Sequence, residues 1–352
     1  MSGREAAEGR VRSEGREGSA RRRSFLPLWL LLWAGLNALF LSADLFNLYV
    51  ALELVGLSAV ALVASPGGLP ELRAAMRYFF ANVAASAVFL TGVALVYHQH
   101  QTLDLTALST QVMEASSDRT SLSLLSGALV FKAALFPLHA WLPTAHASAA
   151  PPVSALLSAL VVKAPVYLLA RFWLDAFRSV VDDPAFVLVG ALGAIGMIWG
   201  SSQAIRAKRL KVLVAYSTVA QVGLLFAAFP IVATSGSGAW LGLVLLAAGH
   251  ALAKAAMFLA AGGIARAHGH DRLAELVGFG ARVPVCMYAF GLAGMSLVGI
   301  PGTVGFLGKW HLATAGMAAA AAPWVVVVTL SSLFTASYVW KVLAIAIRSA
   351  PA

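Results

Sequence analysis

The sequence predicts an all-helical membrane protein, and three observations lead to this fold class. Of the 352 residues, 60% are hydrophobic and 11% are charged, about half the charged fraction of a soluble globular domain, and the mean hydropathy is +0.83. The apolar stretches run for about 20 residues, the length that a helix needs to cross hydrocarbon. None shows the alternation that is typical of a membrane β-barrel. We therefore expect a bundle of transmembrane helices.

The first 24 residues differ from the rest of the chain. They are rich in Arg, Glu, Gly and Ser with little that could be buried, so we expect 1–24 to be a disordered basic tail. Arg21 to Arg23 followed by apolar residues is similar to the start of a signal peptide. Leu41, however, stands where a cleavage site needs a small residue, so we expect an uncleaved first helix.

Ten membrane spans follow from the hydrophobic pattern. Their expected ranges are 25–43, 44–64, 74–97, 120–138, 153–173, 185–203, 211–231, 239–262, 283–318 and 323–347. The ninth range is too long for one straight crossing, and 299–305 contains Pro301 and three glycines. Pro137 interrupts the fourth range in the same way. We expect two broken helices, which a membrane protein tolerates where protein or water surrounds the exposed backbone.

The charges of the loops predict the orientation. Basic residues gather in alternate loops at Arg73, Arg77, 206–211, Arg266, Arg272, Arg282 and Arg348, on the same side as the basic tail. The opposite loops hold Asp104, Glu114, Asp118, Asp175, Asp182 and Asp183, with Arg119, Arg171 and Arg178 as their basic members. Because cytoplasmic loops carry the excess of Lys and Arg, we expect a multi-pass protein of the cell (inner) membrane with both termini in the cytoplasm.

Ten spans divide into two sets of five, 25–173 and 185–347. An odd number of crossings places the second copy upside down, and each half has a proline-broken fourth helix with a lysine. Lys132 precedes Pro137, and Lys309 follows Pro301. Interrupted segments at corresponding positions of two halves indicate an inverted-repeat transporter with its pathway at the repeat interface.

Two ionisable residues of the first half are costly in hydrocarbon. Lys132 lies in an apolar stretch, where a charge costs a few kcal/mol on insertion scales; the alternative is a lysine that extends to an interface. Glu53 lies about 13 Å along its helix from Asp44, near the midplane. A carboxylate there must be neutral or paired, so we expect Glu53 within salt-bridge or one-water reach of Lys132. A static salt bridge between helices is the alternative role.

Four further ionisable residues form the rest of the expected proton pathway. Lys163 lies in mid-helix beside Pro165, and His250 and Lys254 are spaced i and i+4, on one helical face. A lone buried histidine is more often a core residue, but the lysine one turn away favours a proton-handling pair. Buried lysines change their protonation state readily, and Lys309 completes the row. His139 and His146, after the Pro137 break, are expected as supporting residues together with Pro301.

The sequence contains no motif that indicates another class of function. The single Cys286 excludes an internal disulfide and a cysteine-based metal cluster, and a metal site at His268 and His270 is weak. The net charge of +10 follows membrane topology, since 7 of the 25 basic residues lie in the first 23 positions. We therefore expect no cofactor, no metal, no nucleic-acid partner and no catalytic site within the chain.

Six motifs in order carry a family resemblance. They are 44–50 with Glu53, 136–143, 151–157 with Lys163, 208–223, 250–258 and 301–309. Together they resemble the antiporter-like subunits of respiratory complex I, the large subunits of Mrp-type sodium/proton antiporters and those of membrane-bound hydrogenases. The stretches 44–53 and 77–82 look most like the Mrp D-type subunit.

The resemblance implies a hydrophilic axis across the membrane centre. Glu53 resembles the carboxylate paired with Lys132, Lys163 the bridging lysine, and Lys254 with His250 and Lys309 the second half-channel. Three departures stand out: the chain matches ten of about fourteen family helices, Thr144 replaces a common aspartate, and Pro165 replaces a more usual glycine. The unmatched helices bear on subunit contacts more than on the channel itself.

The function implied is proton translocation within a larger complex of membrane subunits, with sodium as a candidate exchange ion. Because the chain has no nucleotide or cofactor motif, its energy would come from partners, as in a complex I-like NADH:quinone oxidoreductase or a cation antiporter. Two alternatives stay open. One is a membrane partner for proton-driven uptake of inorganic carbon, and the other is a non-conducting structural subunit.

Overall fold

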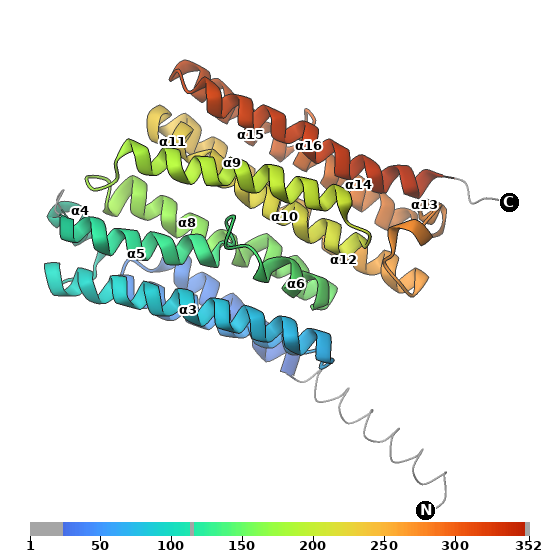
Figure 1. The fold of residues 1–352 in the computed structure, drawn as a ribbon, viewed down its shortest axis with the longest axis horizontal. Helices are drawn as coiled ribbons and strands as arrows, with labels where there is room; N and C mark the ends of the chain where they lie inside the picture. The colour runs from blue at the N-terminus through green and yellow to red at the C-terminus, as the bar shows by residue number, and fades with distance from the viewer. Residues whose placement is uncertain (1–23, 113–115, 349–352) are drawn as a thin grey trace, which may run out of the picture.

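The computed structural model describes residues 24–112 and 116–348. Residues 1–23 of the predicted tail and Glu114 lie outside the described residues, so the expectation of disorder stays a prediction. Within the described ranges the chain is helical, and its β-structure is confined to two isolated bridges. Helices run roughly parallel or antiparallel in one bundle (Figure 1), and the described chain begins and ends at the same end of it. The predicted all-helical fold is confirmed.

Eight helical stretches are long and apolar enough to cross a membrane. Their bounds are Ser24–Leu41, α2 (Leu45–Ala64), α3 (Leu69–His100), Pro151–Ala176, α9 (Asp183–Arg206), Leu210–Ser235, α12 (Ser237–His268) and α16 (Ala322–Ile347). Pro151–Ala176 comprises α7 (Pro151–Leu156), the π-helix η1 (Leu157–Val161), α8 (Lys163–Arg171) and the π-helix η2 (Phe172–Ala176). Leu210–Ser235 comprises α10 (Leu210–Ala227) and α11 (Phe229–Ser235). These stretches occupy eight of the ten predicted ranges.

The other two predicted spans are both broken helices. α5 (Ser116–Lys132) is followed by α6 (Trp141–Ser148). The break begins before Pro137, because Ala134 adopts a positive φ of 57° and the Leu135 amide returns to the Val130 carbonyl at 3.1 Å, as at a helix C-terminus. The Phe136–Pro137 peptide is cis.

The second break separates α14 (Pro284–Val298) from α15 (Val304–Ala318). Gly299 ends α14 with φ +88°, a left-handed conformation that favours glycine. Thr303 begins α15 as its N-cap, its hydroxyl accepting the Phe306 amide at 3.2 Å. Both interruptions therefore lie in the predicted ranges.

Some helices extend beyond the predicted limits. α3 begins at Leu69, five residues before the predicted start, with Pro70 and Glu71 in its first turn. Proline and an acidic side chain both suit a helix N-terminus. The prediction followed apolar residues only, so it missed the polar turns at both ends of α3. Short elements complete the described chain: α4 (Leu105–Gln111), η3 (Leu273–Glu275) and α13 (Phe279–Arg282).

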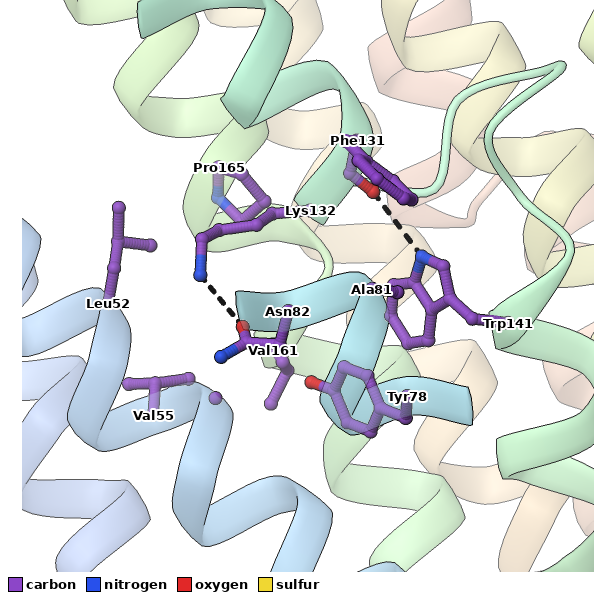
Figure 2. Close-up of a pocket in the computed structure, with 11 residues that line it drawn as sticks. Leu52, Val55, Tyr78, Ala81, Asn82, Phe131, Lys132, Trp141, Val161 and Pro165 are labelled. Atoms are coloured by element: carbon purple, nitrogen blue, oxygen red, sulfur yellow. Dashed lines mark hydrogen bonds between the residues drawn. The ribbon is translucent and has the colours of Figure 1, made fainter. Parts of the chain in front are cut away.

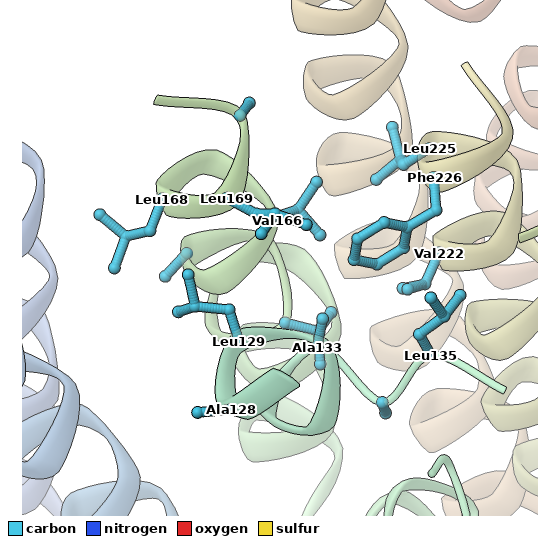
Figure 3. Packing of buried hydrophobic residues seen from close by; sticks show 14 of the residues in the cluster. Ala128, Leu129, Ala133, Leu135, Val166, Leu168, Leu169, Val222, Leu225 and Phe226 are labelled. Atoms are coloured by element: carbon cyan, nitrogen blue, oxygen red, sulfur yellow. The ribbon is translucent and has the colours of Figure 1, made fainter. Parts of the chain in front are cut away.

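Close packing holds helices together within the second half of the bundle and joins that half to the first. α9 and α10 approach so tightly that a Cβ added to Gly193 would lie 2.5 Å from the Gly223 carbonyl oxygen, as at small-residue interfaces of membrane helices. Apolar side chains of α5, α8 and α10 fill the space beside the first break (Figure 3), among them Leu129, Leu169 and Phe226. This packing surrounds the exposed backbone of the break with protein.

Candidate functional site

Glu53 and Lys132 meet at the end of α5, as predicted. The Lys132 Nζ atom lies 3.1 Å from Glu53 Oε1. It also donates to Asn82 Oδ1 at 2.7 Å and to Ser86 Oγ at 2.7 Å, and the Ser86 hydroxyl donates to Glu53. The Lys132 side chain is 7% exposed and the Glu53 side chain is 20% exposed. A charge removed from water in this way is tolerated when it is paired and fully hydrogen-bonded.

Sequence reasoning missed Asn82 and Ser86, which hold this pair together. Both lie on α3, spaced i and i+4, so they share one helical face toward α2 and α5. Gly56 on α2 leaves room for the Asn82 amide, since a Cβ there would lie 2.4 Å from Asn82 Oδ1. A polar i, i+4 pair inside a long apolar helix was the available signal.

A cavity of about 20 Å³ lies beside Lys132 (Figure 2). Its walls include Val161 and Pro165, which flank Lys163 on the π-helix and α8. Room for one water needs about 10–15 Å³, so a single water fits between the Glu53–Lys132 pair and the segment that carries Lys163. Trp141 Nε1 donates to the Phe131 carbonyl at 3.3 Å and ties α6 to the end of α5 here.

Lys163 connects the first half to α10. The residue is buried, and its ammonium donates to the Ser158 carbonyl oxygen in the π-helix η1. A π-helical turn leaves backbone groups with altered partners and is frequent at functional sites. The Ser158 hydroxyl lies 2.9 Å from the Thr218 hydroxyl of α10. The Lys163 ammonium is therefore held inside the protein, while the same side chain also lines a hollow of about 330 Å³ beside Phe40 and Trp240.

Lys254 reaches the same turn of α10 from α12. Its Nζ atom donates to the Val214 carbonyl oxygen at 3.2 Å and to the Ser217 hydroxyl. Thr218 donates to that same Val214 carbonyl at 3.1 Å. Lys163 and Lys254 are thus linked through two residues of α10 and one of η1: Lys163 binds the Ser158 carbonyl, the Ser158 hydroxyl contacts Thr218, and Thr218 and Lys254 share the Val214 carbonyl.

His250 lies one turn from Lys254 and is 2% exposed. Neither of its ring nitrogens has a hydrogen-bond partner among the described residues. Buried polar groups are normally paired with protein or water, so the imidazole needs water or a changing partner. A satisfied core histidine, the alternative for His250, does not fit this geometry.

A second polar cluster, also missed from the sequence, lies between α10 and α16. The Gln221 amide donates to the Thr335 hydroxyl at 3.0 Å and to the Tyr338 hydroxyl at 3.4 Å. Gln221 is one helical turn beyond Ser217 and Thr218. On the other side, Thr335 is one turn from Ser332, the partner of Lys309. The cluster therefore fills the space between the Lys254 and Lys309 groups.

Lys309 lies at the second break, buried against the end of α14. Its Nζ atom donates to the carbonyl oxygens of Leu297 and Val298 at 3.1 and 3.0 Å, and to the Ser332 hydroxyl at 2.9 Å. The last carbonyls of a helix lack partners within the helix and carry negative partial charge. The break itself thus supplies the counter-charge of Lys309.

Residues 42–335 match the family model described as NADH:quinone oxidoreductase/Mrp antiporter, TM. The chain belongs to this family. The predicted family resemblance is confirmed.

Relatives of the NADH:quinone oxidoreductase/Mrp antiporter family fall into both named groups. The N subunit of the NADH-quinone oxidoreductase from Desulforudis audaxviator is 37% identical over 91% of this chain. The Na(+)/H(+) antiporter of Bacillus subtilis has a D-type subunit that is 31% identical over 90% of it. The chain spans 64% of the length of each relative.

Solved structures of the same kind share the fold. The Mrp complex from a Dietzia species contains a chain similar to this one with a TM-score of 0.85 and 28% identity, over 93% of this chain and 61% of that chain. The membrane-bound sulfane sulfur reductase, an archaeal respiratory membrane complex, gives 0.84 and 29%, over 90% and 65%. Like those chains, this one is a multi-pass membrane protein.

The two predicted supporting histidines take different positions in this family member. His146 is buried, and its ring stacks on Phe258 at 4.8 Å, one turn from Lys254. His139 lies on the first break, where its Nε2 accepts from Trp199 at 3.2 Å and its ring stacks on Phe136. We call the series of polar groups from Glu53 and Lys132 through Lys163 and Lys254 to Lys309 the row. Only His146 therefore lies beside the row, while His139 contacts the outer surface of α9.

The breaks determine where the predicted prolines lie. Pro137 is exposed in the segment between α5 and α6, and Pro301 is exposed between α14 and α15. Both therefore lie away from the buried lysines. Pro301 follows the end of α14, whose last carbonyl groups accept from Lys309.

Charge is distributed unevenly along the row. Among the residues that the structure describes, Lys132 is the buried lysine with a carboxylate within 4 Å, whereas Lys163, Lys254 and Lys309 are held by hydroxyl and carbonyl oxygens. The described residues form no cluster of three or more metal-ligating side chains. The row combines one lysine–carboxylate pair with three lysines that are held by neutral oxygens.

Proposed function

We propose that this chain is a proton-translocating membrane subunit of a larger complex. Protons move along the row from Glu53 and Lys132 through Lys163 and Lys254 to Lys309. The observation that supports this most is the series of buried polar contacts from Lys163 through the carbonyl and hydroxyl of Ser158 to Thr218, and from Thr218 through the shared Val214 carbonyl to Lys254. Lysines, hydroxyls and an imidazole are groups that exchange protons with water.

The proton is the ion that suits this row. Three of its four lysines have no carboxylate within 4 Å in the described part of the chain, and a metal cation passing them would meet only positive or neutral groups. Any sodium that the complex exchanges would follow another route. The names of relatives, one from an Na(+)/H(+) antiporter and one from an NADH-quinone oxidoreductase, are compatible with both kinds of complex.

A purely structural subunit is favoured less. Charges that only lock helices together would be satisfied, yet both ring nitrogens of His250 are buried without a partner in the described residues. The partners of the complex are other membrane subunits, as in the Mrp and reductase complexes that the chain is similar to. Loop charges support insertion in the cell (inner) membrane with both termini in the cytoplasm.

The proposal is tested with the full chain in proteoliposomes under an imposed membrane potential. A pH-sensitive dye should report proton uptake that does not depend on added sodium, because the row carries protons alone. Uptake that appears only with a sodium gradient would contradict this route. No uptake by the chain, either alone or with its co-purified partner subunits, would favour the structural role.

A further inference from the structure

The Asn82 side chain carries a buried donor that the Glu53–Lys132 pair does not use. An ammonium can only donate, so the oxygen of the Asn82 amide faces Lys132, at 2.7 Å from Nζ. The amide nitrogen is therefore directed away from Lys132. This Nδ2 atom is buried and has no hydrogen-bond partner in the part of the chain that the structure describes. Because buried polar groups are normally paired with protein or water, the Asn82 nitrogen requires a partner.

Tyr78, one turn before Asn82 on α3, presents a second unpaired group. Its side chain is 4% exposed, yet its hydroxyl makes no hydrogen bond to a described residue. A buried tyrosine hydroxyl usually finds a partner. The ring is stacked on Trp141, with centroids 4.3 Å apart and an angle of 4° between the rings. This stack holds the Tyr78 hydroxyl in one direction, toward the Asn82 side chain (Figure 2).

Asn82 and Tyr78 both line the cavity beside Lys132, which we call the Tyr78 cavity. Its volume is about 20 Å³, and one water needs about 10–15 Å³. A water in this space can accept from Asn82 Nδ2 and share a hydrogen bond with Tyr78 Oη. Buried waters typically make roughly two to four hydrogen bonds. The size of the cavity and its two unpaired groups therefore select the same occupant.

Another wall of the Tyr78 cavity belongs to the segment that carries Lys163. Val161 and Pro165 line this wall, and Pro165 has no N–H to donate to the Val161 carbonyl four residues earlier. That carbonyl loses its usual helical partner, so it is suited to accept from a water. A water bound in this way joins α3 to the turn that carries Lys163.

We propose that the Tyr78 cavity holds one ordered water and that Tyr78 positions this water for proton exchange at Lys132. The inference rests on the proposed function. All three N–H groups of the Lys132 ammonium donate to side-chain oxygens, so one of them must turn from Asn82 Oδ1 to the water before a proton can leave. The ammonium then gives this proton to the water. The water passes one of its own protons toward an uncharged Lys163 and is itself restored.

The first measurement detects the water without relying on transport. Microsecond X-ray radiolysis of the full chain in detergent, read by mass spectrometry, adds oxygen to side chains that contact water. Tyr78 should be modified although it is buried, whereas Tyr338, which is 0% exposed and accepts from Gln221, should not be. Ala81→Leu fills the Tyr78 cavity from α3 and should abolish the modification of Tyr78. Ala84→Leu, at an exposed position of the same helix, is the matched control and should leave it unchanged.

Tyr78→Phe tests the role in transport, because it keeps the stack on Trp141 and removes only the hydroxyl. In proteoliposomes its voltage-driven proton flux should fall about fivefold, the effect of one lost hydrogen bond. The ratio of flux in light water to flux in heavy water should rise, because transfer through a poorly held water becomes the slow step. A variant that only misfolds would lower the flux and keep the ratio. Tyr288→Phe, at a tyrosine that is 65% exposed on α14, should match the wild type in both.

The two measurements separate the possible failures. The inference is overturned if Tyr78 is as unreactive as Tyr338, or if Tyr78→Phe keeps the wild-type flux and isotope ratio. It is overturned as well if Ala81→Leu leaves Tyr78 as reactive as Ala84→Leu does, because the water would then lie elsewhere. A wild-type chain that carries no protons would contradict the proposed function instead, and the modification of Tyr78 would then still decide whether the water site exists.

Discussion

The interaction energy between Glu53 and Lys132 should be large enough to measure, because further hydrogen-bond partners hold the two side chains in place. Lys132 donates to three oxygens within 3.1 Å, so its ammonium is fully hydrogen-bonded. Removing one member of the pair leaves the other charge buried without its partner. The resulting loss of stability exceeds the net contribution of the intact pair. The pair should therefore show strong energetic coupling.

A double-mutant cycle tests this coupling. Glu53→Gln, Lys132→Gln and the double variant should give a coupling of about 1–3 kcal/mol in the free energy of unfolding, measured by denaturant titration in detergent. The exposed Arg272–Glu275 pair is the matched control and should give about 0.2–1 kcal/mol. Equal coupling in the two pairs would mean that the buried pair has no special stabilisation.

Side chains of the site differ in how far the sequence could predict them. Lysines and a glutamate inside apolar stretches are conspicuous, because a buried charge is costly, and this identified Glu53 and Lys132. Asn82, Ser86 and Gln221 are neutral, and single polar residues inside long helices are common. Which of them face a lysine depends on helix rotation, so their role emerged only from the folded bundle.

At the scale of the helix, α10 is the element that links the lysines, because Ser217, Thr218 and Gln221 all face inward. Replacing Gln221 by leucine removes its bonds to Thr335 and Tyr338 and should reduce proton flux, while the free energy of unfolding falls by only about 1 kcal/mol. Gln203→Leu on α9 is the control and should leave flux unchanged. If Gln221→Leu conducts like the wild type, protons do not pass this cluster.

Close contact between α9 and α10 leads to a further prediction. Gly193→Ala should lower the free energy of unfolding by about 1–3 kcal/mol, because the added Cβ would lie 2.5 Å from the Gly223 carbonyl. Gly127→Ala meets nothing within 4 Å and should be neutral or stabilising by up to about 1 kcal/mol. Thermal unfolding in detergent measures both. A neutral Gly193→Ala would show that the two helices separate easily.

Helix breaks were predictable from proline and glycine, but their limits were not. Pro137 led to the correct region, yet α5 ends five residues earlier at Lys132, where Ala134 takes the left-handed conformation. An alanine in the sequence does not indicate a left-handed backbone conformation, as a glycine or asparagine would. Proline restricts its own φ angle and removes a donor, whereas the position of the preceding helix end depends on packing around it.

For the whole molecule, the arrangement as two inverted repeats stays a prediction. Residues 25–173 should superpose on 185–347 after a rotation of about 180° about an axis in the membrane plane, bringing Pro137 near Pro301. Superposition of the two halves in an experimentally determined structure measures this. Halves that superpose only in a parallel sense would remove the basis for one central pathway.

Orientation in the membrane can be tested by labelling. In a Cys286→Ser background, an impermeant thiol reagent should label Ala274→Cys only in inverted vesicles and Thr110→Cys only in intact cells, since the loop with Ala274 is among the basic ones. The unsubstituted background is the control. The reverse pattern would place the basic loops outside and contradict the proposed topology.

The most direct test of the account is proton flux through chains that lack one end of the row. Lys132→Ala and Lys309→Ala, reconstituted in liposomes at the same protein level as the wild type, should each lose most of the voltage-driven flux. Both should still insert in the membrane, and flux is compared below the unfolding temperature of each variant, because Lys132→Ala leaves Glu53 without its partner and should lower that temperature. Full flux in both variants, or loss of both proteins from the membrane, would contradict a buried row that carries protons.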